Sequence, residues 1–381
     1  ECIIKTLGII CIILIMNREN QPLNNVQNQD ENSNITSRKD KIIRRPRDKK
    51  KIIISFIFLC VAIFFLIYNP SHQRREYQQA EGLAFGTEFH ITYYHPENKD
   101  LTTSIYNALN VINSSLSMFD KNSLLYRINS GEVVETDTLF RKVLFAGNEI
   151  SRKSNGAFDM TVAPLVNAWG FGFKNREKID STLIDSLLTN VGWDKISWLG
   201  NYIILPEGMM IDAGAIAKGL GCDVVADTLL ANGATDFCVE IGGEIFAHGV
   251  NNKGKLWRIG INKPEDDSLA TNKDIYKITE IKNCGMATSG NYRRFYIEDG
   301  VKYSHTIDPR TGWPVKHSLL SATIIADNCM TADGWATACM VVGLEEAKVL
   351  IKENGLQGFL IYEENGEIKS WHSEGFPILE D

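Results

Sequence analysis

Seventeen consecutive residues without a charged side chain, Ile52 to Tyr68, divide the chain into two unlike parts. As an α-helix this stretch is about 26 Å long, close to the thickness of the hydrocarbon core of a bilayer. Nine Lys/Arg and two Asp stand directly before it, from Arg38 to Lys51. Because basic residues stay on the cytoplasmic side, the sequence predicts a cytoplasmic, largely disordered tail at 1–51 and a single-pass signal anchor at 52–68. No small-residue cleavage site follows, so we expect an uncleaved anchor in the cytoplasmic (inner) membrane and a catalytic part on its periplasmic side.

The part of the chain that follows a short linker at 69–79 is acidic. Residues 76–381 hold 27 Lys/Arg and 41 Asp/Glu, a net charge of −14. A domain this acidic lacks the basic face that a phosphate backbone requires, so we expect no nucleic-acid partner. A phosphate-bearing ligand would need a metal ion and a few well-placed cations instead. Residues 80–381 are long enough to bury a sizeable core and are predicted to form one compact domain.

Helical and strand-like patterns alternate irregularly in this domain. Because there is no regular strand–helix–strand rhythm, the pattern predicts the α+β class with mixed, largely antiparallel sheets rather than a doubly wound parallel sheet. The predicted helices span 101–116, 138–155, 213–230, 332–342 and 344–353, and the predicted strands span 83–94, 202–212, 235–249, 257–262, 273–282, 291–297, 319–326 and 359–362.

The cysteines of the predicted exported part do not indicate a structural cross-link. There are five, at Cys222, Cys238, Cys284, Cys329 and Cys339, and no two have the Cys-x-x-Cys spacing of a zinc or redox site. We therefore expect isolated, mostly buried thiols and neither a disulfide framework nor a zinc centre.

The first segment that indicates chemistry reads Met-Ile-Asp-Ala-Gly-Ala-Ile-Ala-Lys-Gly, from Met210 to Gly219. A strand here runs into a small-residue turn that opens a helix, and such a junction points free backbone N–H groups and the positive helix end at an anion. Asp212 lies in the turn and Lys218 in the first turns of the helix. Lys218 is followed by Gly219 rather than Ser or Thr, so this is not a Walker A loop. Taken alone, the segment is also an ordinary glycine- and alanine-rich helix start.

A second segment, from Tyr303 to Pro314, reads Tyr-Ser-His-Thr-Ile-Asp-Pro-Arg-Thr-Gly-Trp-Pro. Its prolines and glycine favour a fixed turn. His305 precedes this turn and is a candidate titratable group beside a ligand, although a lone histidine is more often structural.

A third segment, from Thr331 to Thr337, places Asp333 and Thr337 four residues apart, on one face of a helix. A carboxylate and a hydroxyl so placed can share a hard, oxygen-seeking cation such as Mg²⁺. The alternative is an acidic residue that favours the helix dipole and a threonine packed sideways.

Two aromatic segments accompany these motifs. Phe158 and Asp159 precede the glycine-rich aromatic run Trp169–Phe173, and Phe119 lies in Ser117–Asp120. Aromatic side chains beside polar turns can hold a flat heterocycle, although packing in the core explains most of them.

The order of the motifs is more specific than any one of them. FDxT, DxGxxAKG, GG, SGxY, HxxDPxTGxP and DxxxT, with the aromatic segments, follow one another within residues 80–365. In this order they resemble the ApbE family of flavin transferases, which move FMN from FAD onto a threonine of a target protein. The resemblance implies that fold and that activity for the chain.

The resemblance also implies roles for particular residues. His305 and Asp333 correspond to catalytic residues, and Phe85 and Phe119 replace the methionine and the tyrosine that are usual in the family. The implied FAD contacts are Phe85, Phe119, Phe158, Asp159, Asp212, Lys218 and Ile307, and the implied Mg²⁺ ligands are the Ala215 carbonyl and the side chains of Asp333 and Thr337.

The chemistry of the implied reaction is consistent with these residue types. A threonine hydroxyl attacks the FMN-side phosphorus of the FAD diphosphate and AMP leaves, a phosphoryl transfer that depends on positioning and charge neutralisation. In an acidic domain, Mg²⁺ and Lys218 supply the positive charge. His305 is the candidate acceptor of the threonine proton, because histidine has an ordinary pKa of about 6.5.

Two other functions stay open at this level. Water could replace threonine in the same site, which would make the chain an FAD diphosphatase that yields FMN and AMP. Alternatively, the chain could be a non-catalytic flavin-binding module, in which metal ligands would have no purpose.

The partner implied by the resemblance is an exported acceptor protein with a threonine flavinylation motif, for which respiratory sodium pumps and related exported flavoproteins are the family's usual examples. Asn232 to Thr235 partly matches such a motif, but its place at a predicted helix end favours a helix cap. We therefore expect the chain to modify another protein and not itself.

Overall fold

The computed structural model of the protein describes residues 49–68, 75–172, 177–264, 274–291, 295–298 and 301–379. The chain divides into two compact units, residues 1–70 and 71–381. The first unit is described only in helix α2 (Lys49–Tyr68), where apolar side chains such as Phe58 are exposed.

The structure does not support the predicted membrane anchor. Residues 52–68 are helical and form most of α2. Within the described ranges, no helix combines the length and the apolar character that a bilayer crossing requires. The predicted tail lies outside the described residues up to position 48, and the predicted linker does so at 69–74. The last two residues of the predicted linker, 78 and 79, belong to the first strand of the second unit.

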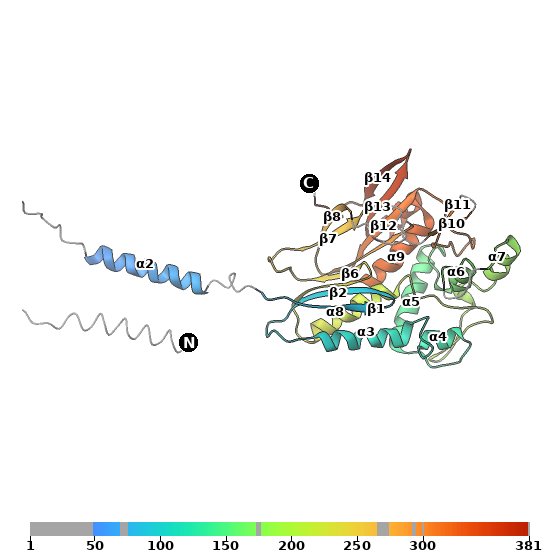
Figure 1. Cartoon of the computed structure of the whole chain (residues 1–381), viewed down its shortest axis with the longest axis horizontal. Helices are drawn as coiled ribbons and strands as arrows, with labels where there is room; N and C mark the ends of the chain where they lie inside the picture. The colour runs from blue at the N-terminus through green and yellow to red at the C-terminus, as the bar shows by residue number, and fades with distance from the viewer. Residues whose placement is uncertain are drawn as a thin grey trace, which may run out of the picture. The chain divides into compact units, whose positions relative to one another are not determined.

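The second unit is built on an eight-stranded sheet in which every neighbouring pair of strands is antiparallel (Figure 1). In spatial order the strands are β1 (Gln78–Ala84), β2 (Thr87–Tyr94), β5 (Asp236–Ile241), β6 (Glu244–His248), β9 (Cys284–Gly290), β12 (Leu319–Ala326), β13 (Gln357–Glu364) and β14 (Glu367–His372).

Helices and three small two-stranded sheets complete this unit. The helices are α3 (Thr102–Leu116), α4 (Leu124–Asn129), α5 (Thr138–Lys153), α6 (Ala163–Ala168), α7 (Ser181–Leu188), α8 (Ala217–Ala231), α9 (Cys329–Val342) and α10 (Leu344–Glu353), with single 3₁₀ turns η2 (Met160–Val162) and η3 (Trp193–Lys195). The small sheets pair β3 (Ser197–Leu199) with β4 (Tyr202–Ile204), β7 (Trp257–Asn262) with β8 (Ile275–Ile281), and β10 (Phe295–Glu298) with β11 (Val301–Ser304). The predicted α+β class is confirmed.

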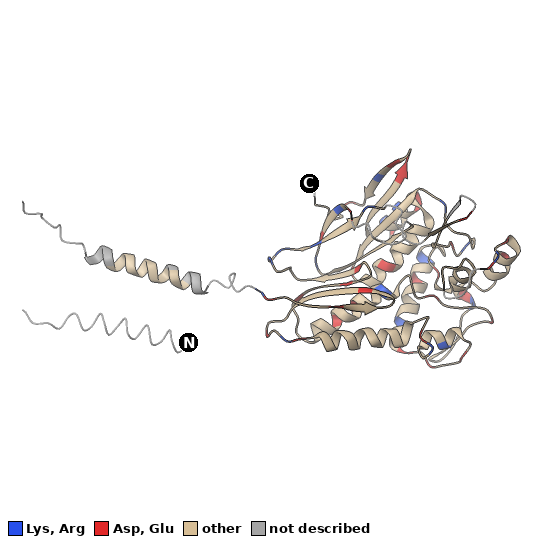
Figure 2. Cartoon of the chain, in the orientation of Figure 1, with Lys and Arg blue, Asp and Glu red and all other residues tan. Residues whose placement is uncertain are grey.

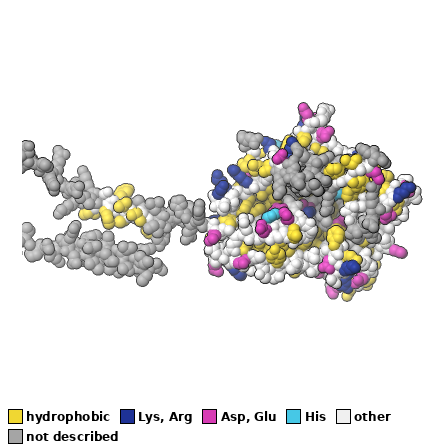
Figure 3. Space-filling view, in the orientation of Figure 1, with side chains coloured by type: hydrophobic (Ala, Val, Ile, Leu, Met, Phe, Trp, Pro, Cys, Tyr) yellow, Lys and Arg dark blue, Asp and Glu magenta, His cyan; other side chains and the backbone are white. Residues whose placement is uncertain are grey.

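The core lies on both faces of the large sheet, because side chains alternate along each strand. On β12, Ala322 and Ile324 pack with the residues of α9, whereas Ile325 packs with Ile261 and Ile281 of the β7–β8 hairpin. Helix α8 packs on β5 and β6, and α9 packs on β9 and β12. Lys, Arg, Asp and Glu residues are spread over the elements of this unit (Figure 2), and the face in Figure 3 mixes acidic, basic and hydrophobic side chains. Helices α8 and α9 thus lie side by side on the large sheet.

Two predicted strands are in fact hairpins. The predicted strand 83–94 turns at Phe85 and Gly86, whose φ angles of 54° and 76° form a two-residue turn between β1 and β2. The predicted strand 235–249 turns at Gly242 and Gly243, with φ angles of 60° and 99°. Positive φ at both central residues is what a tight hairpin requires, and the apolar pattern continues through such a turn.

The other differences concern element bounds and elements that were not predicted, which also include α4, α6, α7, β3 and β11. The strand predicted at 202–212 ends at Ile204, before Pro206, and the strand predicted at 291–297 is β10, which begins at Phe295. Helix α9 begins at Cys329, three residues before the predicted start, and strands β9 and β14 were not predicted. The described cysteines, from Cys60 to Cys339, are free thiols, and those in the core are buried.

Candidate active site

The loop before α8 is held in place by hydrogen bonds from distant residues. Asn129 of α4 donates to the Ile211 carbonyl and accepts from the Ile211 N–H, both at 2.8 Å. The Asp212 N–H donates to the Met160 carbonyl at 2.6 Å, and the Gly214 N–H donates to Asp212 Oδ1 at 2.6 Å. These bonds fix the Asp-Ala-Gly turn against α4 and η2.

The first turn of α8 is capped by a residue of α9. Ile216, in the N-cap position, provides no side-chain hydrogen bond. The Gly219 N–H instead donates to Asp333 Oδ2 at 2.9 Å. An N-cap side chain usually makes this kind of bond, and here another helix supplies it. Asp333 is thereby placed at the start of α8.

Helix α8 caps α9 in return. Asp223 of α8 accepts hydrogen bonds from the N–H groups of Cys329, at 2.7 Å, and Met330, at 2.9 Å. Asn328 accepts from the Thr331 N–H at 2.8 Å. The first N–H groups of each helix are therefore bonded in part by a carboxylate of the other, which fixes how the two helices meet.

Gly219 makes this close approach possible. A Cβ at position 219 would lie 2.4 Å from the Cys329 carbonyl oxygen and 2.8 Å from Asp333 Cβ.

Because the Cys329 oxygen belongs to the backbone, the helices would have to separate to admit a Cβ at position 219. We therefore expect Gly219→Ala to lower the free energy of unfolding by about 1–3 kcal/mol. Chemical denaturation would measure this. Gly260→Ala is the matched control, since its Cβ would meet only side-chain atoms of Ile275, at 3.0 Å or more, and no backbone atom; equal losses in both variants would contradict this explanation.

The Asp223 carboxyl gives the fold a defined pH dependence. Burial raises its pKa from 3.8 to about 6 although Met330 and Cys329 N–H groups favour the charged form. Its folded pKa is above its unfolded pKa, so its stabilising contribution is complete below about pH 4 and is lost as the pH rises through 6. The rise of this pKa from 3.8 to about 6 corresponds to roughly 3 kcal/mol.

We therefore expect the free energy of unfolding of Asp223→Asn, measured by denaturant titration between pH 4 and 7, to lack part of the decline that the wild type shows. Asp327→Asn, at an exposed residue just before α9, is the control and should follow the wild-type curve. Parallel curves for wild type and Asp223→Asn would contradict this pH assignment.

Beside the capped turn lies a cluster of one lysine and two carboxylates. Lys218 Nζ is 3.3 Å from Glu244 Oε1 and 3.9 Å from Asp333 Oδ1, and the side chains are 27%, 5% and 6% exposed respectively. Burial raises the pKa of both carboxyls, and the Lys218 ammonium opposes this rise. Burial alone would lower the pKa of Lys218, but Asp333 and Glu244 outweigh it and raise that pKa. The ammonium is therefore charged at neutral pH.

The cluster is short of positive charge. It holds two carboxyl groups and one ammonium, and Glu244 Oε2 has no hydrogen-bond partner among the described residues. A buried carboxylate without a full set of partners is costly. An additional cation beside Asp333 would relieve this imbalance.

The predicted Mg²⁺ ligands fit such a cation by their chemistry. Thr337 is half-buried one turn after Asp333 on α9, and Ala215 is half-buried in the loop before α8. The set comprises one carboxylate, one hydroxyl and one carbonyl, all hard oxygen donors of the kind that Mg²⁺ accepts together with substrate oxygens. In the described part of the chain, no group of three His, Cys, Asp or Glu side chains forms an alternative metal site.

The second predicted motif folds into a closed turn. The Asp308 N–H donates to the Trp313 carbonyl at 3.0 Å, and Ile307 and Pro314 form an antiparallel bridge. Trp169 Nε1 donates to the Gly312 carbonyl at 2.9 Å, which ties the turn to the aromatic segment.

That aromatic segment packs against His305 and against Tyr303 of the same motif. Trp169 stacks on Tyr303 with ring centroids 5.5 Å apart, and Phe171 meets the His305 ring at 6.4 Å with 69° between the planes. Ile307 is 5% exposed and belongs to the same small core as Trp169. Two motifs that are distant in the sequence thus form one structure, with His305 half-buried within it.

The remaining predicted FAD contacts lie in different surroundings. The Phe85 ring lies against α8, since a Cβ on Gly221 would be 2.8 Å from it. Phe119 is 71% exposed, whereas Phe158 is buried in the main core. Asp159 Oδ1 accepts from the N–H and the hydroxyl of Thr161, and burial raises the pKa of Asp159. The FAD contacts assigned to these residues stay predictions.

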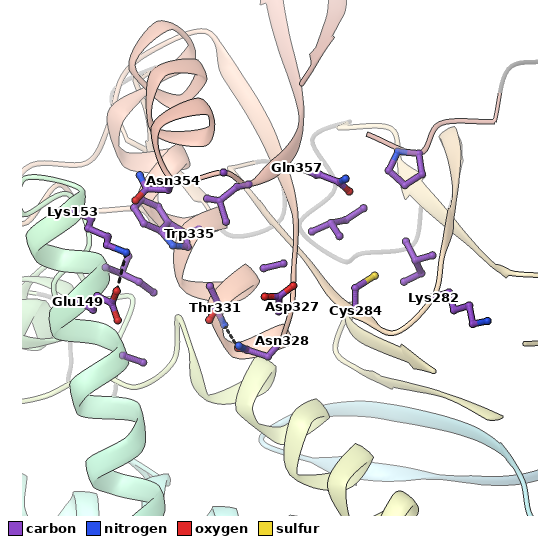
Figure 4. Close-up of a pocket in the computed structure, with 18 of the residues that line it drawn as sticks. Glu149, Lys153, Lys282, Cys284, Asp327, Asn328, Thr331, Trp335, Asn354 and Gln357 are labelled. Carbon is purple, nitrogen blue, oxygen red and sulfur yellow. Dashed lines mark hydrogen bonds and ion pairs between the residues drawn. The ribbon is translucent and has the colours of Figure 1, made fainter. Parts of the chain in front are cut away.

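Two pockets in the described part of the chain are not centred on these residues. A pocket of about 590 Å³ lies between α5, α9 and the β8–β9 connection (Figure 4). Its α9 residues, Thr331 and Trp335, lie on the helix face opposite Asp333 and Thr337. A second pocket, of about 460 Å³, includes Asp159 in its lining. The candidate active site is therefore identified by the arrangement of its side chains and not by either pocket.

Sequence reasoning missed the partners of the predicted residues. None of these partners was assigned a role from the sequence. They are Glu244, which contacts Lys218, Asp223, which caps the helix of Asp333, and Asn129, which holds the loop of Asp212. A signal did exist for Glu244, which is the one charge in the apolar strand that follows Gly242–Gly243. Asn129 and Asp223 lie in helices whose sequences do not indicate their partners.

Comparison with known proteins agrees with this architecture. The ApbE family model matches residues 85–360. A FAD:protein FMN transferase of Vibrio cholerae is 36% identical over 78% of this chain and 91% of that protein, and one of Escherichia coli is 31% identical over 84% and 95%. The crystal structure of flavin transferase ApbE from Vibrio cholerae superposes with a TM-score of 0.71 at 35% identity, covering 79% of this chain and 98% of that one. The apo flavinyl transferase ApbE of Pseudomonas stutzeri gives 0.71 at 29% identity, covering 79% and 95%.

The antiparallel sheet, the α8–α9 junction and the motif order thus define a protein of the flavin-transferase fold. The chain belongs to the ApbE family, and the predicted resemblance is confirmed.

Proposed function

We propose that this chain transfers the FMN part of FAD to a threonine hydroxyl of an acceptor protein, with Mg²⁺ and with release of AMP. Its class, FAD:protein FMN transferase, follows from the family and from the relatives that carry this name. The observation that supports the detailed proposal is the Lys218–Glu244–Asp333 cluster. It lies at the start of α8, where Asp333 of α9 supplies the capping carboxylate.

The residues of the chain provide for charge and orientation. Lys218 presents an ammonium at the N-terminal turn of α8, where backbone N–H groups and the helix dipole also favour an anion. Asp333, Thr337 and the Ala215 carbonyl are proposed to hold Mg²⁺. When bound there, the ion would neutralise charge on the diphosphate and on the departing AMP.

His305 is proposed to take the proton of the attacking threonine. The threonine oxygen forms a bond to the FMN-side phosphorus, the bond from that phosphorus to the bridging oxygen breaks, and AMP leaves with the electron pair. The packing of His305 against Phe171 orients the imidazole, and a general base has to be within hydrogen-bond reach of the proton it accepts.

We further propose residues 80–381 as the catalytic domain and an exported location for it. Support for the location comes from the sequence, in which basic residues precede the uncharged stretch 52–68. A C-terminal fusion to a reporter enzyme that is active only outside the cytoplasm would test it. A fusion that is inactive although it is stably produced would exclude export.

The decisive experiment uses the full-length chain, FAD, Mg²⁺ and a purified acceptor domain that carries a threonine flavinylation motif. Intact mass of the acceptor, AMP and free FMN are measured together. A mass gain of one FMN with one AMP, abolished by EDTA, supports the proposal. Free FMN and AMP with an unmodified acceptor would indicate a diphosphatase, and intact bound FAD without either product would indicate a binding module.

A further inference from the structure

Glu244 belongs to the cluster but has no role in the transfer chemistry proposed above. It opens β6 directly after the turn at Gly242–Gly243, and its side chain is 5% exposed. Such a residue has to be explained, because burying a carboxylate without a partner is unfavourable. Its one ionic partner among the described residues is Lys218.

The two distances in the cluster show which carboxylate holds Lys218. Lys218 Nζ is nearer to Glu244, at 3.3 Å, than to Asp333, at 3.9 Å, and the shorter separation is just beyond the usual range of a direct hydrogen bond. Asp333 is already bonded to the Gly219 N–H. Glu244 is therefore the nearer of the two carboxylates and the one better placed to hold the end of the Lys218 side chain.

We infer that Glu244 is a positioning residue for the diphosphate of FAD, which acts by holding the Lys218 ammonium beside Asp333. The inference rests on the proposed function and adds to it. The rigid strand that carries Glu244 keeps the ammonium at the N-terminal turn of α8. Without it, Lys218 would be free to move toward Asp333 and would compete with a cation for that carboxylate.

Simple electrostatics predicts the opposite effect, which makes the inference testable by its sign. Glu244 is a negative group close to the place proposed for an anionic diphosphate. If it acted only through its charge, its removal would strengthen binding of the diphosphate. If it acts by positioning Lys218, its removal weakens that binding.

The probe is ADP with Mg²⁺, since ADP carries a diphosphate and no flavin to transfer. Isothermal titration calorimetry on the full-length chain compares wild type, Glu244→Gln, Lys218→Met and the double variant. We expect Glu244→Gln to weaken ADP binding about tenfold. In the Lys218→Met background the same change should have no further effect, because a residue that acts through another has no independent contribution. Glu367→Gln, an exposed residue of β14, is the control and should bind ADP like the wild type.

Each other result overturns the inference. Unchanged or tighter ADP binding by Glu244→Gln would show a purely electrostatic role, and an equal loss in both backgrounds would show a role independent of Lys218. If the glutamine variant does not fold, as judged by thermal unfolding, Glu244→Asp replaces it; this variant keeps the charge with a shorter reach, and wild-type binding by it would contradict positioning. A wild type that does not bind ADP with Mg²⁺ would refute the proposed function itself, a result distinct from all of these.

Discussion

Replacement of Asp333 by asparagine is expected to lower the rate of flavin transfer by about 10²–10³-fold. Asp333 supplies both the carboxylate of the proposed metal site and the nearest negative charge to Lys218 after Glu244. Asparagine has the same shape and can still accept the Gly219 hydrogen bond, so the helix junction is preserved. The loss therefore falls on charge, which is what phosphoryl transfer depends on.

The folded state should not suffer from this change. Removing one partner of a balanced buried ion pair is costly, because the other charge is left alone. Here one ammonium faces two carboxylates, and the change leaves Lys218 and Glu244 as a balanced pair. We expect the midpoint of thermal unfolding of the metal-free variant to equal or exceed that of the wild type.

The measurement is the initial rate of FMN transfer at increasing Mg²⁺, with thermal unfolding in parallel. Asp227→Asn, at an exposed position on α8, is the control and should retain the wild-type rate. Transfer by Asp333→Asn within threefold of the wild type, at the same Mg²⁺ requirement, would remove Asp333 from the metal site.

Replacement of His305 by glutamine is expected to slow transfer by about 10²–10⁴-fold while FAD binding is retained. His305 is half-buried against Phe171, in a turn that Trp169 and Tyr303 hold by stacking. Glutamine can occupy this space and can make hydrogen bonds, but it cannot take up the threonine proton. The effect should therefore appear in the rate of the chemical step rather than in affinity.

Single-turnover transfer and equilibrium FAD binding separate these two effects. His372→Gln, on the exposed face of β14, is the control and should behave as the wild type in both. A variant that loses FAD binding but retains its single-turnover rate at saturating FAD would show that His305 is a ligand contact and not the base.

Local sequence patterns predicted the elements whose partners are close in the chain. Helices α5 and α10 were predicted nearly to the residue, because apolar periodicity and flanking caps are encoded within each segment. The hairpins at Phe85–Gly86 and Gly242–Gly243 were missed, because an alternating pattern continues unchanged through a tight turn. A phenylalanine with positive φ is also uncommon enough that the pattern gives no reason to expect it.

The same limit applied to the candidate site. Motifs identified Lys218, Asp333 and His305 because each lies in a short segment of distinctive composition. The bond between Gly219 and Asp333 spans 114 residues, and the bond between Asn129 and Ile211 spans 82. Contacts of this range depend on how the sheet orders its strands, which composition and periodicity do not determine.

The exchange of capping carboxylates between α8 and α9 has a consequence for how activity arises during synthesis. Helix α8 carries Lys218 and β6 carries Glu244, but the carboxylate that completes their cluster is made about ninety residues later, in α9. A nascent chain that has reached only β9 lacks Asp333, and therefore lacks both the cap of α8 and one of the proposed metal ligands. We therefore expect turnover to begin only after α9 has docked on α8, so that its onset would measure the completion of folding.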